Sequence, residues 1–171
     1  MADTLDQATR SRIMSLVRSK DTKPEKLVRS MVHRMGYRFR LHVKQLPGKP
    51  DLVLRRLGLV IFVNGCFWHQ HPGCRKAGRP ATNEDFWNDK LDATVKRDRL
   101  TQSKLRRLGW RVSVVWECET FNGNLERLRQ RLSLVLSRAE EPAKMNACRP
   151  LYRTATSMTQ HAPQSPTQPN C

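Results

Sequence analysis

The chain has 171 residues and a formal net charge of +17, from 32 Lys and Arg against 15 Asp and Glu. This length allows one domain and little more, and no apolar run is long enough to cross a bilayer. Residues 139–171 hold three basic and two acidic residues, so a charge of +16 belongs to the remainder. A compact domain this basic is expected to bind a polyanion, with nucleic acid as the first candidate and an anionic membrane or a merely solubilising surface as alternatives.

The first residues do not have the pattern of a signal peptide, which predicts a cytoplasmic protein. The five cysteines are an odd number, and three of them lie near histidines or at the ends of predicted strands. In a reducing compartment this pattern favours metal binding over disulfides.

The beginning of the chain predicts an arm, a helix and a strand. Residues 1–20 have a helical apolar pattern with basic residues around it, and we expect them to contact the partner as an N-terminal arm. Thr22-Lys-Pro-Glu25 is a capping box, and the helix that it begins should end at Gly36. Residues 37–43 alternate apolar and polar side chains, which predicts a half-buried strand.

The later elements complete one sheet. They are predicted in this order: strands at 51–54 and 59–63, a helix capped by Thr82 and ended by Gly109, a strand at 110–116 and a helix at 125–135. This order predicts an α/β fold with helices on both faces of the sheet. From Ala139 on, Pro, Gln, Thr and Ser dominate, so we expect three parts: the arm over 1–20, a folded domain over 21–138 and a disordered tail over 139–171.

The turn after the strand at 59–63 carries metal-type ligands. Cys66, His71 and Cys74 have the spacing C-x4-H-x2-C, and Cys118 follows a strand that can neighbour the central one. Thiolates with imidazole suit tetrahedral zinc, and four protein ligands leave no open position, so the ion would be structural. Ordinary buried cysteines are the alternative, and His69 is an alternative ligand to His71.

One carboxylate and the end of the central strand are candidates for holding a second metal. Asp51 opens a strand one hairpin away from the histidine-rich turn, where it can hold Mg²⁺ with Asn64 or the carbonyl of Val63 as the next oxygen ligand. An ordinary turn residue is the alternative for Asp51. Glu25 has a sufficient explanation as the return half of the capping box.

His69 and Asp98 are candidates for proton transfer. His69 lies off the zinc spacing, and a free imidazole near a metal can activate water; a surface histidine is the alternative. Asp98 interrupts the apolar stripe of the long helix and needs a partner. That partner is either a histidine, which Asp98 would orient as a base, or a neighbouring arginine.

Phe67 and Trp68 stand between the candidate ligands and beside a basic loop at 75–80. Exposed aromatic rings on basic ground are typical of groups that stack on bases or wedge between them. Packing in the core is the alternative, which the crowding by polar neighbours disfavours.

A set of short motifs follows in order along residues 1–136. They are Met1-Ala-Asp3, Ala8-Thr-Arg-Ser11 with Met14, Gly65-Cys-Phe-Trp-His69, Phe86-Trp87, Lys90, Arg97-Asp98, Gly109-Trp-Arg-Val112 and Val115-Trp-Glu-Cys118. Together they resemble the very short patch repair (Vsr) DNA mismatch endonucleases, and the combination is far more specific than any single motif.

The resemblance implies a mixed sheet flanked by helices, similar to that of restriction endonucleases, with a structural Zn²⁺. It implies Mg²⁺-dependent nicking of one DNA strand 5′ to the thymine of a T:G mismatch left by deamination of 5-methylcytosine. Double-stranded DNA with that mismatch is then the substrate of a monomeric enzyme, and mismatch-repair proteins are further partners.

The resemblance also gives each candidate a role by position. The catalytic roles are Mg²⁺ binding by Asp51 and the backbone of Val63, base catalysis by His69, support of that base by Asp98 and ordering of water by Glu25. The zinc ligands are Cys66, His71, Cys74 and Cys118. The DNA contacts are wedging by Met14, Phe67 and Trp68, base contact by Lys90, and mismatch reading at the position of Thr94.

Three departures from the family pattern affect these roles. Val63-Asn64 replace a Thr-His that some members carry, which keeps a backbone carbonyl but loses an imidazole near the metal or phosphate. Gly73 lengthens the zinc loop by one residue. Thr94 replaces an Asn that helps to read the mismatch, so it bears on site preference.

Two other functions compete with the mismatch endonuclease. One is a zinc-structured DNA-binding module without catalysis, and the other is a restriction-type nuclease without mismatch preference. The presence of both Asp51 and His69 favours an enzyme over the binding module, because nicking needs metal stabilisation and a base within reach.

Overall fold

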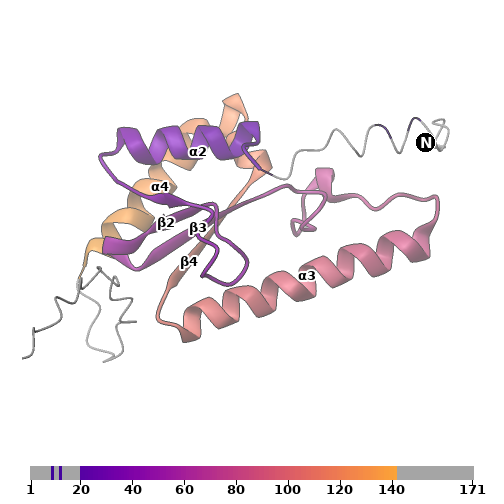
Figure 1. Cartoon of the computed structure of the whole chain (residues 1–171). Helices are drawn as coiled ribbons and strands as arrows, with labels where there is room; N and C mark the ends of the chain where they lie inside the picture. Colours follow the sequence, from indigo (N-terminus) through magenta and orange to yellow (C-terminus); the bar gives the residue numbers. More distant parts are fainter. Residues whose placement is uncertain (1–8, 10–11, 13–19, 142–171) are drawn as a thin grey trace, which may run out of the picture.

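The computed structural model describes Thr9, Arg12 and residues 20–141. The arm predicted over 1–20 therefore lies almost entirely outside the described residues, as do the wedge candidate Met14 and the tail from 142 on. Figure 1 shows the described part as a sheet with helices α2 and α4 on one face and the long helix α3 on the other.

The centre of the fold is a four-stranded sheet in the order β1-β2-β3-β4. Its strands are β1 Arg40–Leu41, β2 Leu52–Leu54, β3 Leu59–Asn64 and β4 Arg111–Trp116. The pairs β1–β2 and β2–β3 are antiparallel and β3–β4 is parallel, so the prediction of a mixed α/β sheet is confirmed. Because Val63 pairs with Val115 and Asn64 with Trp116, β3 and β4 end at the same edge of the sheet.

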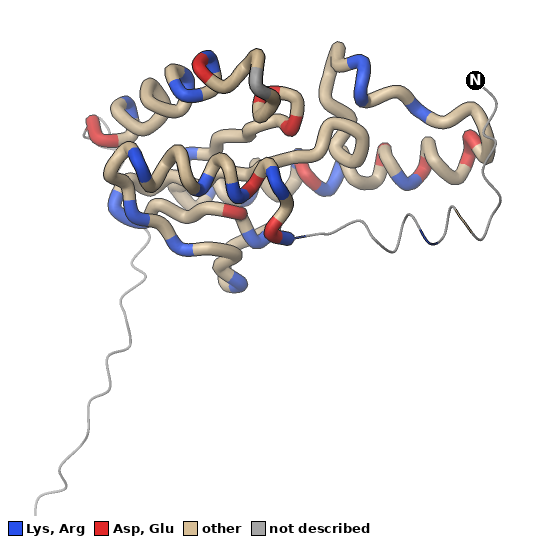
Figure 2. The backbone as a smooth tube through the Cα atoms, turned by 90° about the horizontal axis from the view of Figure 1, so that it is seen from above, with Lys and Arg blue, Asp and Glu red and all other residues tan. Residues whose placement is uncertain are grey.

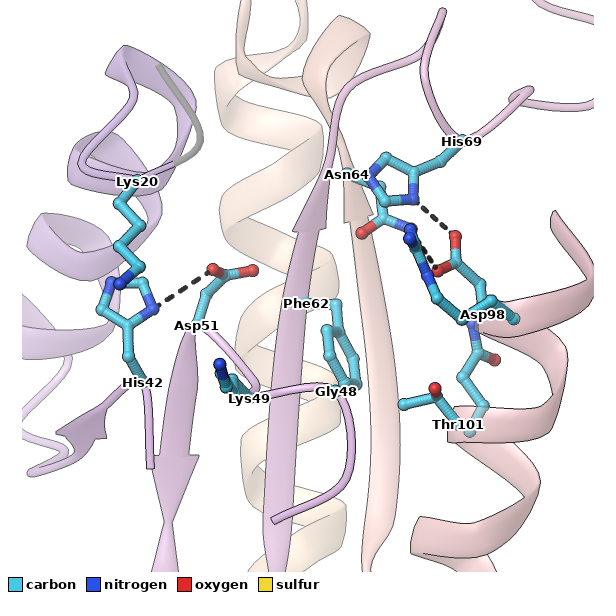
Figure 3. Close-up of a pocket in the computed structure, with 12 residues that line it drawn as sticks. Lys20, His42, Gly48, Lys49, Asp51, Phe62, Asn64, His69, Asp98 and Thr101 are labelled. Atoms are coloured by element: carbon cyan, nitrogen blue, oxygen red, sulfur yellow. Dashed lines mark hydrogen bonds and ion pairs between the residues drawn. The ribbon is translucent and has the colours of Figure 1, made fainter. Parts of the chain in front are cut away.

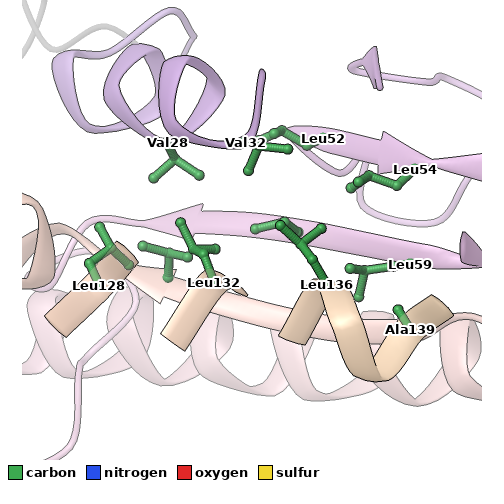
Figure 4. Close-up of a cluster of buried hydrophobic side chains, with 11 residues drawn as sticks. Val28, Val32, Leu52, Leu54, Leu59, Leu128, Leu132, Leu136 and Ala139 are labelled. Atoms are coloured by element: carbon green, nitrogen blue, oxygen red, sulfur yellow. The ribbon is translucent and has the colours of Figure 1, made fainter. Parts of the chain in front are cut away.

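Two of the helices, α2 Lys23–Arg34 and α4 Leu125–Glu140, bury apolar side chains spaced one turn apart. Val28 and Val32 of α2 and Leu128 and Leu132 of α4 meet sheet residues such as Ile61 in the larger core cluster (Figure 4). All five side chains are at most 1% exposed. This cluster holds the sheet rigid under the edge where the candidate site lies.

Helix α3, Glu84–Arg107, packs on the sheet only near its C-terminal end, where Leu105 joins Val53 and Val60 in a second core cluster. Its N-terminal half extends beyond the sheet (Figure 1), and Trp87 is buried there against rings from the loop that follows β3. Asn83, in the left-handed region at φ +55°, is the residue directly before the helix, so α3 begins one residue later than predicted from Thr82.

The strand predicted over 37–43 is much shorter in the structure. Only β1 is extended and paired, because His42 adopts a left-handed conformation at φ +44° that ends the strand. Tyr37 and Phe39 pack against the larger core cluster, whereas Val43 packs against the second. The alternating residues therefore do not share one face.

The last helix is longer than predicted. α4 continues through Ala139, which is buried in the larger core cluster, to Glu140. The boundary of the tail at 139 is thus set too early, since Ala139 belongs to the folded part. No helix in the described part of the chain is long and apolar enough to cross a membrane.

Candidate active site

The edge at which β3 and β4 end gathers the candidate catalytic residues. Asp51 directly precedes β2, which runs antiparallel to β3, and Asn64 is the last residue of β3. The backbone N–H of Val63 donates a hydrogen bond to Asp51 Oδ2 at 2.8 Å, which holds the carboxylate at the end of the central strand. His69 reaches the same edge from the turn after β3, where its amide donates to the carbonyl of Gly65 at 3.1 Å.

Asp51 and His69 lie on opposite walls of a cleft of about 320 Å³ (Figure 3). Lys20, Lys49 and Arg97 also line this cleft and give it positive charge. Arg97 belongs to the Arg97-Asp98 motif of the sequence, whereas Lys20 and Lys49 were not predicted as site residues, although Lys49 lies in the turn that leads into Asp51. A cleft that combines a carboxylate, an imidazole and three cations can bind a phosphodiester and support its hydrolysis.

The carboxylate of Asp51 is held in an unfavourable electrostatic environment. Its side chain is 18% exposed. Burial raises the pKa of Asp51 above its ordinary value, the hydrogen bond from the Val63 N–H opposes that rise, and the nearby charge of Glu25 adds to it. A bound cation would remove this cost, so Asp51 fits a metal ligand better than a turn residue.

His69 and Asp98 form a close pair. His69 Nδ1 lies 2.5 Å from Asp98 Oδ2, so the sequence alternatives for the partner of Asp98 are decided in favour of histidine. Arg97 lies 3.7 Å from the other oxygen of Asp98, but its side chain is 67% exposed, so this ion pair is weak. With Nδ1–H directed at the carboxylate, the lone pair on His69 Nε2 is the acceptor that the ring offers.

Glu25 is buried in the first turn of α2, where its amide donates to Thr22 Oγ1 at 3.4 Å as the predicted capping box requires, but the return bond comes from the Asp21 amide instead of the Thr22 amide. Its carboxylate accepts hydrogen bonds from Thr22 Oγ1 at 2.9 Å and from the Asp21 amide at 3.0 Å. The guanidinium of Arg29 also donates to it at 2.7 Å. Glu25 does not line the cleft, and the His42 ring lies between it and Asp51, with nitrogens 4.0 Å from Glu25 Oε2 and 3.8 Å from Asp51 Oδ1.

The four predicted zinc ligands converge. One ligand atom from each of Cys66, His71, Cys74 and Cys118 lies within 4.8 Å of the others. His71 Nδ1 is 3.7 Å from Cys66 Sγ and 3.3 Å from Cys118 Sγ, close to the edge of about 3.5 Å expected between ligands of tetrahedral zinc. The His71 ring also stacks on Trp116, with centroids 4.3 Å apart.

The donor set fits a soft divalent cation. Burial raises the pKa of the Cys66 thiol to about 12, so the thiolate there requires a compensating positive charge. The turn is closed by a hydrogen bond from the His71 amide to the Cys66 carbonyl at 3.0 Å. His69 is not in this group, since its ring is paired with Asp98. The described residues thus contain a Cys/His group able to hold a metal ion, separate from the cleft.

Phe67 and Trp68 are half-buried rather than fully exposed, because they pack on the projecting half of α3. The rings of both contact Trp87, with centroids 5.6 Å and 6.1 Å away. Phe86, which is 50% exposed, continues this aromatic cluster, and Lys90 Nζ lies 5.3–5.6 Å from three of its rings. The cluster presents apolar edges next to a cation, and the spacing of Phe86 and Lys90 by four helical residues could have indicated it.

Thr94 lies on α3 one turn after Lys90. Its hydroxyl donates to the Lys90 carbonyl at 3.0 Å, within the helix. That bond engages the hydroxyl proton and leaves an oxygen acceptor on this face of the helix.

Comparison with known proteins identifies the family. Residues 2–76 match the family model for DNA mismatch endonuclease Vsr. A type II nicking enzyme, V.XorIIP of Xanthomonas oryzae, is 48% identical over 136 residues, which cover 80% of this chain and 98% of that protein. The chain belongs to the Vsr family.

Two further relatives cover similar lengths. The type II nicking enzyme V.NmeAIP of Neisseria meningitidis is 42% identical over 71% of this chain and 86% of its own length. The DNA mismatch endonuclease Vsr of Escherichia coli is 46% identical over 69% of this chain and 75% of its own length. As a member of the Vsr family the chain is an endonuclease, which confirms the prediction of an enzyme that acts on DNA.

Proposed function

We propose that this Vsr-family endonuclease nicks one DNA strand 5′ to the thymine of T:G mismatches that arise from deamination of 5-methylcytosine, in a Mg²⁺-dependent reaction. The observation that carries the proposal is the cleft itself, where Asp51 faces the His69–Asp98 pair across a space lined with cations. This arrangement supplies a carboxylate for a hard cation and an oriented base for water.

The proposed chemistry assigns one task to each wall of the cleft. Asp51, the carbonyl of Val63 and the side chain of Asn64 are the oxygen donors for Mg²⁺, which would polarise the phosphate and stabilise its developing charge. His69 Nε2 takes a proton as the oxygen of water attacks phosphorus. The bond between phosphorus and one of the bridging oxygens of the DNA strand breaks, and that oxygen takes a proton from solvent. Asp98 stabilises the imidazolium that His69 has become.

Glu25 retains its proposed role in ordering water, although its carboxylate is bonded to Arg29 and the capping box. Its influence on the cleft reaches Asp51 through charge, since it raises the pKa of that carboxyl. We expect Glu25 to affect the site through its charge, from the far side of the His42 ring.

The Cys66, His71, Cys74 and Cys118 group is proposed to hold structural Zn²⁺. Four protein donors fill a tetrahedral site and leave no position for substrate. The ion would fix the loop that carries Phe67, Trp68 and His69, and would thereby place the wedge and the base relative to the sheet.

The aromatic cluster is proposed to select the mismatch. A T:G wobble is easier to unstack than a paired step, so wedging by Phe67 and Trp68 has its lowest cost there. Lys90, among the same rings, is placed to contact bases, and Thr94 one turn later is placed to read the site. Met14, outside the described residues, would complete the wedge from the arm.

The test is a nicking assay on duplexes that differ only at one pair, T:G or T:A, with each strand labelled separately. Zinc-loaded protein is assayed with and without added MgCl₂. We expect nicking of the thymine strand of T:G duplex only with MgCl₂, and a loss on the order of 10²–10⁴-fold in His69→Ala. Asp51→Asn should abolish nicking while DNA binding stays nearly unchanged, because the cations of the cleft remain.

Glu126→Gln is the control, since Glu126 lies on α4 and makes only exposed contacts with Arg129 and Gln130. Strong nicking by Asp51→Asn at saturating Mg²⁺ would refute the metal role of Asp51. Binding without any nicking by the wild type would support the zinc-structured binding module, and equal nicking of both duplexes would support a nuclease without mismatch preference.

A further inference from the structure

His42 is a second imidazole beside the cleft, and its sequence context alone predicts no role for it. It follows β1 and lies on the wall opposite His69, where Figure 3 shows its ring facing Asp51. His42 Nδ1 is 3.8 Å from Asp51 Oδ1. On its other side, Nε2 is 2.9 Å from a guanidinium nitrogen of Arg29. The ring therefore links α2 to the end of the central strand.

The arginine decides which nitrogen of His42 carries the proton. A guanidinium has only donors and no acceptor, so Nε2 of His42 must offer its lone pair to Arg29. The N–H of the ring is then on Nδ1, and Nδ1 is the atom that faces Asp51. Arg29 is itself fixed by its bonds to Asp21 and Glu25, and its side chain is 12% exposed.

A metal ion is not needed to explain this cluster. Ligand atoms of Asp21, Glu25 and His42 lie within 4.8 Å of one another. However, the guanidinium of Arg29 already bonds to all three side chains and supplies their positive charge. The Asp21, Glu25 and Arg29 side chains thus form a hydrogen-bonded network that holds the His42 ring in place.

We propose that His42, with its tautomer set by Arg29, is a positioning residue that fixes the carboxylate of Asp51 for Mg²⁺. The proposal rests on the proposed role of Asp51 as a metal ligand. The Val63 N–H holds Oδ2 at 2.8 Å, and the Nδ1–H of His42 faces Oδ1, so the two donors define the plane of the carboxylate. The 3.8 Å contact is longer than a hydrogen bond, and we expect it to shorten to one when Mg²⁺ and DNA occupy the site.

The first measurement is the tautomer of His42. The full chain, zinc-loaded, free of Mg²⁺ and labelled with ¹⁵N at histidine, is examined by NMR, with the His42 signals identified by their loss in His42→Asn. We expect a protonated Nδ1 and an unprotonated Nε2. A proton on Nε2, alone or together with Nδ1, would overturn the proposal, and this measurement needs no variant to remain folded other than the one used for assignment.

The second measurement is the binding of Mn²⁺, as a probe of the Mg²⁺ site, by calorimetry on zinc-loaded protein. His42→Ala should weaken Mn²⁺ binding about 10-fold, as expected for loss of a group that orients a metal ligand. His42→Asn should recover most of this loss, because its amide nitrogen takes the place of Nδ1. His33→Ala is the matched control, since His33 is an exposed histidine on α2.

Nicking assays give a further readout. In His42→Ala the Mg²⁺ concentration for half-maximal nicking should rise about 10-fold, while the rate at saturating Mg²⁺ changes little, because His42 does not touch the reacting atoms. If Asp51→Asn loses Mn²⁺ binding and His42→Ala does not, the role of His42 is refuted and the proposed function stands. If Asp51→Asn binds Mn²⁺ as the wild type does, both are refuted.

Discussion

Asp51, the proposed Mg²⁺ ligand, is a carboxyl group whose ionised form is disfavoured by burial in the folded chain. Its carboxylate is mostly buried, which raises its pKa, and the charge of Glu25 beyond the His42 ring adds to that rise. A charged group in such a place destabilises the folded chain until a cation binds. The hydrogen bond from the Val63 N–H offsets only part of that cost.

We therefore predict that Asp51→Asn makes the chain more stable at neutral pH when Mg²⁺ is absent. Because the folded pKa is raised, the unfolded chain loses this proton first, and folding stability falls as pH rises from the ordinary pKa of Asp through the raised one. At a pH above both the unfolded and the folded pKa of Asp51, the destabilisation of the folded chain is constant. At a pH below both pKa values it is zero. The melting temperature of zinc-loaded Asp51→Asn should exceed that of the wild type by a few degrees at pH 7, and by nothing near pH 3.

The comparison uses Asp89→Asn as control, since Asp89 is an exposed residue of α3 beyond the first turn, and its substitution should shift neither value. A variant less stable than the wild type at pH 7 would show that the carboxylate is stabilised in the fold. The expected loss of nicking, with a gain in stability, would mark Asp51 as retained for function.

At the scale of single residues, the sequence predicted those candidate residues whose chemistry and neighbours along the chain point to a role. Asp51 after a turn and His69 after a strand could both be found, as could the need of Asp98 for a partner. His42 and Arg29 could not, because their contact joins α2 to a left-handed residue after β1. That conformation reverses the face on which the alternating pattern of residues 37–43 would have placed the ring.

At the scale of elements, the segment between β3 and α3 has little regular secondary structure and is held in place mainly by side-chain contacts. Within it the described residues form only one short 3-10 turn, Arg75–Ala77, and no strand. It is held to α3 by the rings around Trp87 and by Arg79, which bonds to Asn88 and Asp92. Its base is held to the end of β4 by the cysteine and histidine group.

We predict that Cys118→Ser lowers the melting temperature by about 10 °C, because a structural zinc contributes folding free energy directly. Cys118 is the one ligand of the group from outside the segment, so its loss detaches the loop from β4. Thermal unfolding and metal analysis of both proteins are the measurements. Cys148→Ser, which lies outside the described residues, is the control, and wild-type protein with much less than one zinc per chain would contradict the assignment.

The elements themselves were largely readable from sequence. The capping box of α2 and the apolar run of β3 act locally, so both were predicted in the right places. The end of α4 was placed too early, although Ala139 continues the buried stripe of Leu132 and Leu136 at helical spacing and Ala favours a helix. The projection of α3 beyond the sheet also depends on tertiary contacts that no period in the sequence reports.

At the scale of the whole molecule, we expect the net charge to give affinity for DNA and the aromatic cluster to give selectivity. Lys and Arg are spread along the described chain, with acidic residues between them (Figure 2). The high net charge of +17 favours any duplex through phosphate contacts and counterion release, which carry no information about a mismatch. We therefore assign the proposed discrimination of the mismatch to the aromatic cluster on the projecting half of α3, where Phe67 and Trp68 meet Trp87.

Trp68→Ala tests this division. Wedging costs a few kcal/mol per step and is least at a T:G pair, and an aromatic stack returns about 1–3 kcal/mol per base. The variant should thus bind T:G duplex about 5–150-fold more weakly while its affinity for matched duplex changes little, since matched duplex is held mainly by phosphate contacts. Both affinities are measured at one salt concentration, with Phe121→Ala, an exposed ring away from α3, as control. An equal loss on both duplexes would mean that Trp68 only packs against Trp87 or makes a general contact, and the wedge would then have to lie elsewhere.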